Sequence, residues 1–129
     1  MKKIGEYYSE TVMSLPEKER ELREFEHISE EFKIERDLFG WQLYSGKKKY
    51  IECRSEEEAR YLLVFFDAGL REIYVPKDDD YLKSILPELE RLKKRTDEII
   101  DDYLDGVLSR NIRKQVRHAV YMEITTQET

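Results

Sequence analysis

The stretch WQLYSGKKKYIECRSEEEARYLLVFFDAGLREIYVP, residues 41–76, decides the fold. It opens with two short runs rich in aromatic and β-branched residues, 41–44 and 48–53. The segment Ser45-Gly46-Lys47 joins them, and its glycine can take the positive φ that a tight hairpin requires. The first half of the stretch therefore predicts a β-hairpin.

The second half predicts a helix and a third strand. Ser55 is a suitable N-cap and Glu58, three residues later, completes the pattern of a capping box. Gly69 suits the left-handed residue that follows a helix. The run Glu72 to Val75 has strand character and is stopped by Pro76. Residues 40–77 are therefore expected to form a ββαβ unit with a small three-stranded sheet, made of the hairpin plus one strand.

Both flanks of this unit are expected to be helical. Residues 1–39 look helical on a charged background, and Pro16 suits the first turn of a helix over 17–39. One apolar stripe of that helix would consist of Leu22, Phe25, Ile28, Phe32 and Leu38. Residues 78–125 also read as helices, with Pro87 marking a break or restart. No repeat or flexible linker divides the 129 residues, so we expect a single α+β domain whose helices pack on the sheet.

Composition favours a folded cytoplasmic protein. Charged residues make up 40% of the chain and hydrophobic residues another 40%, which is too much apolar material for a disordered chain. Cys53 is the single cysteine and cannot form an internal disulfide. No segment has the length of an apolar leader or membrane span, so we expect no membrane partner.

Sequence motifs of catalysis are missing. The chain contains no phosphate-binding loop, no nucleophile elbow and no pair of residues with zinc-ligand spacing. Asp37 with Glu52 and Arg54 resembles the metal-binding pattern of some nucleases, but arginine is a poor substitute for the lysine of that pattern because it does not readily lose a proton. We therefore expect no enzyme activity and no cofactor.

The clearest functional pattern is basic. Four cations lie at i, i+3, i+4 and i+7 in the last expected helix and would share one face: Arg110, Arg113, Lys114 and Arg117. A second basic group, Lys47, Lys48 and Lys49, falls at the hairpin tip. Such groups can bind nucleic-acid phosphates and release counterions. The alternative is that the helical cations pair with the acidic run at residues 97–105.

Two further surfaces are open alternatives. Tyr44, Tyr50 and Tyr74 would share one sheet face, which could stack unpaired bases or could be covered by a helix. A seam of apolar residues at coiled-coil spacing suggests a homodimer interface or internal packing; its members are Ile85, Leu89, Leu92, Ile99 and Tyr103. With 29 acidic residues and a net charge of −6, an acidic mimic of DNA is a third alternative.

Three segments also carry a family resemblance: Tyr50 to Leu62, Arg71 to Lys77 and Asp97 to Ile100. Over residues 40–120 the chain resembles segments near the C-termini of adenine-specific DNA methyltransferases of restriction-modification systems, outside their catalytic domain. The catalytic Asn-Pro-Pro-Tyr-type motif and the cofactor loop of those enzymes are absent here. The resemblance implies an accessory or DNA-contacting module of a defence system, partnered with DNA or a nucleic-acid enzyme, without methyl-transfer activity.

Overall fold

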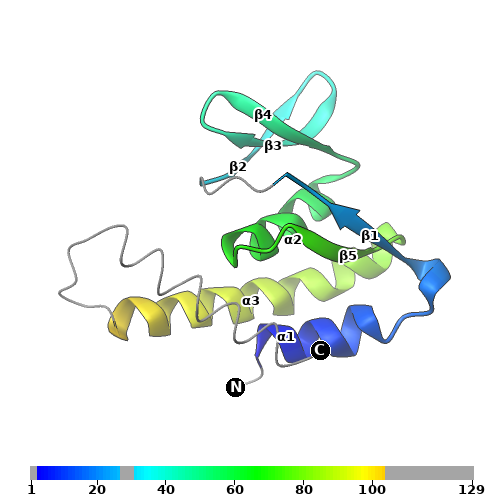
Figure 1. Ribbon diagram of the computed structural model, residues 1–129, viewed down its shortest axis with the longest axis vertical. Coiled ribbons are helices and arrows are strands. Elements are labelled where there is room, and N and C mark those ends of the chain that lie inside the picture. Colours follow the sequence, from blue (N-terminus) through cyan, green and yellow to red (C-terminus); the bar gives the residue numbers. More distant parts are fainter. Residues whose placement is uncertain (1–2, 27–30, 104–129) are drawn as a thin grey trace.

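The computed structural model describes residues 3–26 and 31–103 and shows an α+β fold (Figure 1). The chain begins with α1 (Ile4–Tyr8), which continues as the π-helical turn η1 (Ser9–Met13), and then with the short 3-10 helix η2 (Glu17–Glu19). The strands are β1 (Arg20–Glu24), β2 (Lys33–Asp37), β3 (Gly40–Ser45), β4 (Lys48–Cys53) and β5 (Glu72–Pro76). Two long helices lie within the described residues, α2 (Glu56–Asp67) and α3 (Asp79–Tyr103).

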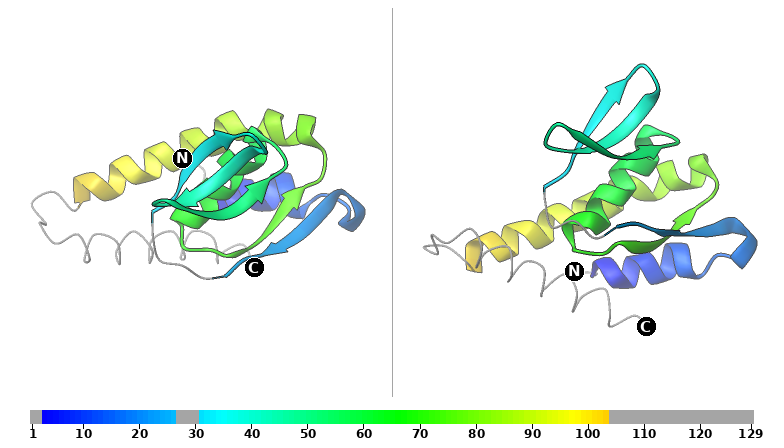
Figure 2. Two further views of the ribbon diagram at one scale, coloured as in Figure 1. Left: turned by 90° about the horizontal axis from the view of Figure 1, so that it is seen from above. Right: turned by 45° about the horizontal axis from the view of Figure 1, so that its top comes forward.

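The strands of this part of the chain form two separate antiparallel sheets. One contains β2, β3 and β4 in that order, and the other pairs β1 with β5. Helix α2 lies between them and contacts all three strands of the larger sheet, while its other side packs on α3 (Figures 1 and 2). The three-stranded sheet is therefore an outer layer, set apart from the layer formed by α1 and α3.

Helix α2 begins and ends where the sequence predicts. The Oγ of Ser55 accepts a hydrogen bond from the backbone N–H of Glu58 at 3.1 Å. At the other end Gly69 has φ +86°, and the N–H groups of Gly69 and Leu70 donate to the carbonyls of Phe66 and Phe65. This is the Schellman arrangement that terminates many helices. The predicted hairpin is confirmed as β3 and β4, with Gly46 at φ +63°.

The predicted helix over residues 17–39 is wrong. Most of that segment forms η2, β1 and β2. Among the described residues up to 39, the helical ones are 4–13 in α1 and η1 and the short turn 17–19 in η2. Phe25 and Phe32, which the helical interpretation put on one stripe, both pack on the ring of Phe66 in α2, with ring centroids 5.1 and 5.4 Å apart. Pairing of the flanking residues with β5 and β3 therefore overrides a helix-forming composition.

The predicted sheet has the right number of strands but the wrong membership. We expected Glu72 to Val75 to join the hairpin, whereas β5 pairs with β1, with Leu22 opposite Tyr74. The third strand of the hairpin sheet is β2, with Ile34 opposite Leu43. The hydroxyl groups of Tyr8 and Tyr61 bond the backbone N–H and C=O of Tyr74, so side chains occupy the position that a neighbouring strand would take.

Helix α3 continues through Pro87, where we expected a break. Pro87 lies on the exposed side of the helix, so water can bond the carbonyl of Lys83 that loses its N–H partner. Asp78 caps the start of α3 by accepting a hydrogen bond from the N–H of Asp80 at 2.9 Å. The remainder of the expected C-terminal helices, residues 104–125, lies outside the described residues.

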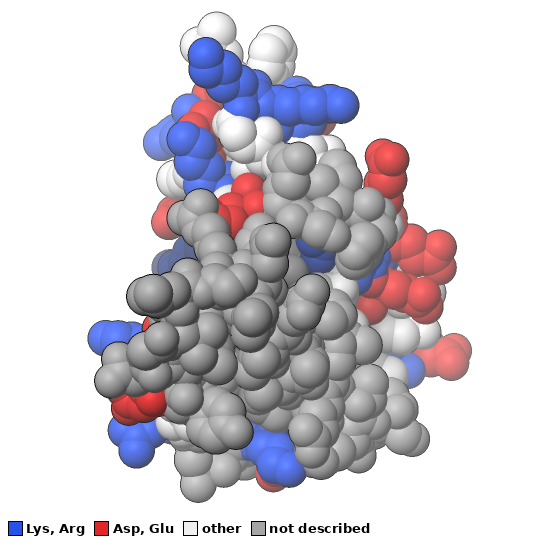
Figure 3. Space-filling model, turned by 60° about the vertical axis from the view of Figure 1, so that its left-hand side comes forward, with Lys and Arg blue, Asp and Glu red and all other residues white. Residues whose placement is uncertain are grey.

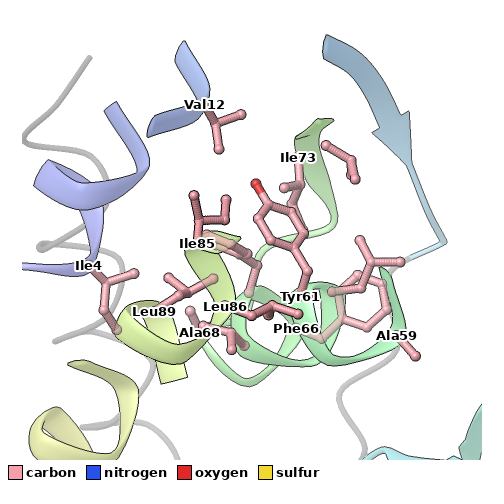
Figure 4. Packing of buried hydrophobic residues seen from close by; sticks show 14 of the residues in the cluster. Ile4, Val12, Ala59, Tyr61, Phe66, Ala68, Ile73, Ile85, Leu86 and Leu89 are labelled. Carbon is pink, nitrogen blue, oxygen red and sulfur yellow. The ribbon is translucent and has the colours of Figure 1, made fainter. Parts of the chain in front are cut away.

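One hydrophobic core joins the helices to β5. Figure 4 shows side chains from α1, α2, β5 and α3 meeting there, among them Ile4, Tyr61, Ile73 and Leu86. All four are almost completely buried. The hydroxyl of Tyr7 donates to the carbonyl of Ile85 at 3.2 Å, which ties α1 to α3.

A buried carboxylate links the sheets to α2. Glu58 is inaccessible to solvent, and its two oxygens lie 3.3 and 3.2 Å from guanidinium nitrogens of Arg23 in β1 and Arg54 after β4. Arg54 also bonds Asp79 at 2.7 Å and the carbonyl of Pro76. The network therefore connects β1, β4, α2, β5 and the start of α3.

We expect Glu58→Gln to lower the free energy of unfolding by about 1.5 to 3 kcal/mol, because charge-assisted hydrogen bonds are removed and two arginines keep their charges without the carboxylate. Urea unfolding followed by circular dichroism measures the change. Glu57→Gln is the matched control, since it removes the same charge one residue earlier in α2 where no ion pair is formed within the described residues. Equal stability of both variants would contradict the role of Glu58.

Candidate nucleic-acid interface

The predicted basic hairpin tip is exposed. Lys47, Lys48 and Lys49 occupy the β3–β4 turn and the start of β4, and all three side chains are open to solvent. Lys49 is engaged, because its Nζ lies 2.8 Å from a carboxylate oxygen of Glu52 and this hydrogen bond raises its pKa. No carboxylate of the described residues lies within ion-pair distance of Lys47 or Lys48. These two ammonium groups are available to an anion.

The other predicted cations cannot be placed beside them. Arg110, Arg113, Lys114 and Arg117 lie outside the described residues, and so does the acidic run's continuation after Tyr103. Whether the two basic groups share a face therefore stays a prediction.

The three-stranded sheet is locally basic in an acidic molecule. Between Lys33 and Cys53 the chain carries five basic and three acidic residues, against 23 and 29 in the whole chain. Figure 3 shows several Lys and Arg side chains at the end of the molecule that this sheet forms, with a few acidic side chains between them, while a group of acidic side chains lies at the right edge below and other Lys and Arg side chains lie lower down. Lys33 contacts Glu35 at 3.2 Å, whereas Arg36 stands over the ring of Trp41, 5.7 Å from its centroid.

The turn between β2 and β3 carries two exposed apolar side chains. Leu38 and Phe39 are 98% and 84% exposed, far more than any other large hydrophobic residue of the described chain. We expected both to end a helix, with Leu38 on its apolar stripe. In the structure they are the two residues between Asp37 and Gly40, which pair across the hairpin. An aspartate followed three residues later by a glycine is typical of a type I turn. This spacing could have revealed the turn in the sequence.

Asp37 fixes the shape of this turn. Its Oδ1 accepts hydrogen bonds from the side chain of Gln42 at 3.0 Å and from the N–H of Phe39 at 2.8 Å, and its Oδ2 accepts from the hydroxyl of Tyr44 at 3.2 Å. Gly40 has φ +113°, a conformation that favours glycine. The bonds from Gln42 and Phe39, with that from Tyr44, lower the pKa of the Asp37 carboxyl.

The expectation that Tyr44, Tyr50 and Tyr74 share one sheet face is wrong. Tyr74 lies in the β1–β5 sheet, away from the hairpin that carries the other two tyrosines. Tyr50 is enclosed by aromatic rings, with centroids 4.9 Å from Phe32 and 5.7 Å from Phe66. Tyr44 bonds Asp37. The three rings therefore do not form a shared surface for bases.

The predicted dimer seam belongs mainly to the core of this chain. Ile85, Leu89 and Leu92 are buried against α1 and α2, so these three side chains are not available to a second copy. Ile99 remains half exposed, at 50%. Tyr103 ends α3. Of the five residues proposed as an interface, the structure places three in intramolecular packing.

Chemically reactive groups are scarce in the described part of the chain. Burial and the nearby charge of Glu58 raise the pKa of the Cys53 thiol to about 12, so the nucleophilic thiolate is disfavoured. Within residues 3–26 and 31–103, no three His, Cys, Asp or Glu side chains are grouped to hold a metal ion.

A groove of about 400 Å³ between α2 and α3 is lined largely by charged residues, of which Arg60 pairs with Glu90 and Lys93 with Asp97.

No helix among the described residues combines the length and apolar character needed to cross a membrane. Comparison of the chain with protein-family models, with curated proteins and with solved structures found no match. The functional interpretation therefore rests on the sequence, geometry and charge of this chain.

We expect the pKa of Asp37 to lie below its ordinary value of 3.8. A carboxyl titration followed by NMR measures it. Because the folded pKa is depressed, the stability that Asp37 contributes is fully present above pH 3.8 and is lost as pH falls through the folded pKa. Gln42→Leu should move the Asp37 midpoint upward more than Tyr44→Phe does. A wild-type titration midpoint at or above 3.8 would contradict the hydrogen bonds that the Asp37 carboxylate accepts from Phe39, Gln42 and Tyr44.

Leu89→Ala tests the assignment of the seam. We expect a decrease of about 2 to 5 kcal/mol in the free energy of unfolding, because a buried leucine is replaced by a cavity. The decrease should be the same at low and high protein concentration. A dimer interface would instead make the decrease in stability depend on protein concentration, which unfolding series at several concentrations would reveal.

Proposed function

We propose that this chain is a non-enzymatic nucleic-acid-binding module, an accessory to an enzyme that modifies DNA, and that the three-stranded sheet carries part of the binding surface. The observation that carries the proposal is the pair of exposed ammonium groups of Lys47 and Lys48, which no carboxylate of the described residues neutralises, on a locally basic sheet of an otherwise acidic molecule. The resemblance of residues 40–120 to non-catalytic segments of DNA methyltransferases favours DNA as the partner.

The charge distribution suits this role in physical terms. A protein that neutralises phosphates releases condensed counterions, so binding strengthens at low salt. Lysines at the tip of a hairpin can follow a backbone without reading sequence, because each ammonium group acts as a point charge. The acidic remainder of the molecule would repel nucleic acid and thereby orient it toward the sheet. Arg110, Arg113, Lys114 and Arg117, which the sequence predicts to share one helix face, are proposed as a second binding region.

The test is titration of the whole protein with a labelled duplex and a labelled single strand at two salt concentrations. We expect binding at low salt that weakens as salt rises. Lys47→Gln with Lys48→Gln should weaken it further and reduce the salt slope by about one for each phosphate that the protein no longer neutralises. A variant in which Arg110, Arg113, Lys114 and Arg117 are all changed to Gln tests the second binding region separately.

The matched control is Lys77→Gln with Lys83→Gln, which removes two exposed lysines from the loop before α3 and from α3 itself. It changes the net charge equally but leaves the sheet intact, and it should bind like the wild type. If the wild-type protein binds neither oligonucleotide at low salt, the proposed function is wrong. Equal weakening by both double variants would mean that overall charge, rather than the sheet, governs binding.

A further inference from the structure

The β2–β3 turn presents an aromatic ring that the fold itself does not use. Phe39 is 84% exposed, and no ring contact of the described chain involves it. The neighbouring Leu38 is 98% exposed. The other exposed large hydrophobic residues, Met13, Leu22 and Ile99, each keep about half or more of their surface covered. An exposed pair at one turn therefore stands apart from ordinary scattered surface residues.

The backbone beneath this pair is held in place. The carboxylate of Asp37 accepts the N–H of Phe39, and Gln42 and Tyr44 bond the same carboxylate from β3. Gln42 is itself buried, so the side chain that holds the Asp37 carboxylate is fixed by the surrounding packing. A turn that is already ordered loses little backbone entropy when its side chains bind a ligand.

The surroundings of the turn are cationic and aromatic. Arg36 precedes it on β2, is exposed and stands over the ring of Trp41. The same sheet carries Lys47 and Lys48 at its opposite end, beyond the length of β3. Phosphate pairs with guanidinium and ammonium groups, while an unpaired base offers a flat face to an aromatic ring. Two apolar side chains are too few for the core of a stable protein interface, but one ring is enough for one base.

We infer that the β2–β3 turn is a base-stacking element: the ring of Phe39 stacks on an unpaired base of a single strand, with Leu38 covering its edge and Arg36 pairing with an adjacent phosphate. This inference rests on the proposed function and adds the class of nucleic acid. It makes the sheet a surface for single-stranded or unstacked nucleotides, with stacking at one end and phosphate pairing at the other.

The experiment is fluorescence anisotropy of the whole protein with a labelled thymidine oligonucleotide of about a dozen nucleotides and with a duplex of the same length. Phe39→Leu removes the aromatic face but keeps an apolar side chain, and we expect it to weaken single-strand binding by about tenfold with an unchanged salt slope. Phe39→Trp should bind at least as tightly, and its added indole fluorescence should be quenched by the strand. Because the ring is exposed, urea midpoints of both variants should match the wild type.

Met13→Ser is the matched control, because it removes an exposed apolar side chain from η1, outside the sheet, and it should leave binding unchanged. Wild-type binding that depends on Lys47 and Lys48 but is unaltered by Phe39→Leu would overturn the stacking inference and leave the proposed function standing. Absence of any oligonucleotide binding by the wild type would overturn both. If Phe39→Leu instead reduces sedimentation with vesicles of anionic phospholipid and leaves oligonucleotide binding unchanged, the turn contacts lipid and the inference is wrong.

Discussion

The buried carboxylate of Glu58 is the group on which the arrangement of the elements depends. Burying a charge is unfavourable unless it is paired and hydrogen-bonded. Glu58 meets this requirement through its Oε1, which accepts hydrogen bonds from the guanidinium of Arg23 and from the backbone N–H of Arg54, both at 3.3 Å. Its Oε2 forms an ion pair with the guanidinium of Arg54 at 3.2 Å. Because Arg54 continues to Asp79, an incorrect placement of either sheet would leave an uncompensated charge inside the protein. The network thus specifies the fold as much as it stabilises it.

A second constraint attaches the outer sheet to α2. The ring of Phe66 is contacted by Phe25, Phe32 and Tyr50, and the guanidinium of Arg71 stands 4.7 Å from its centroid. Phe25 directly follows β1, Phe32 directly precedes β2 and Tyr50 lies in β4, so one aromatic side chain of α2 contacts three segments. Burial lowers the pKa of Arg71, and its bonds to the carbonyls of Phe66 and Leu70 offset the loss of hydration. The sheet is anchored on this side, while Leu38, Phe39, Lys47 and Lys48 in its two turns are exposed.

Local signals in the sequence were reliable and long-range pairing was not. The caps of α2, the hairpin at Gly46 and the strand at Glu72 follow from the chemistry of single residues, and the structure has each of them. The partner of β5 could not be read from the sequence, because a short charged strand such as Arg20–Glu24 also suits a helix. The same ambiguity hid the candidate site: Leu38 and Phe39 fit a helical stripe until Asp37 and Gly40 are recognised as turn residues. Lys47 and Lys48 were found from the sequence because a hairpin tip is exposed whatever the strands pair with.

The two turns of the three-stranded sheet differ in how rigidly they hold their exposed side chains, and this difference affects binding. The β3–β4 turn presents flexible lysines, whose long side chains lose rotamer entropy on each contact and can adapt to an irregular phosphate backbone. The β2–β3 turn presents a ring with two rotatable bonds on a backbone held by the Asp37 carboxylate. Flexible lysines suit an interface that attracts phosphates without recognising sequence. A ring on a fixed backbone suits an interface that must hold a base in one position. Since β3 joins the two turns as a single strand, a ligand bound at one of them is positioned relative to the other, so the rigidity of this sheet would set the spacing between the stacked base and the phosphates.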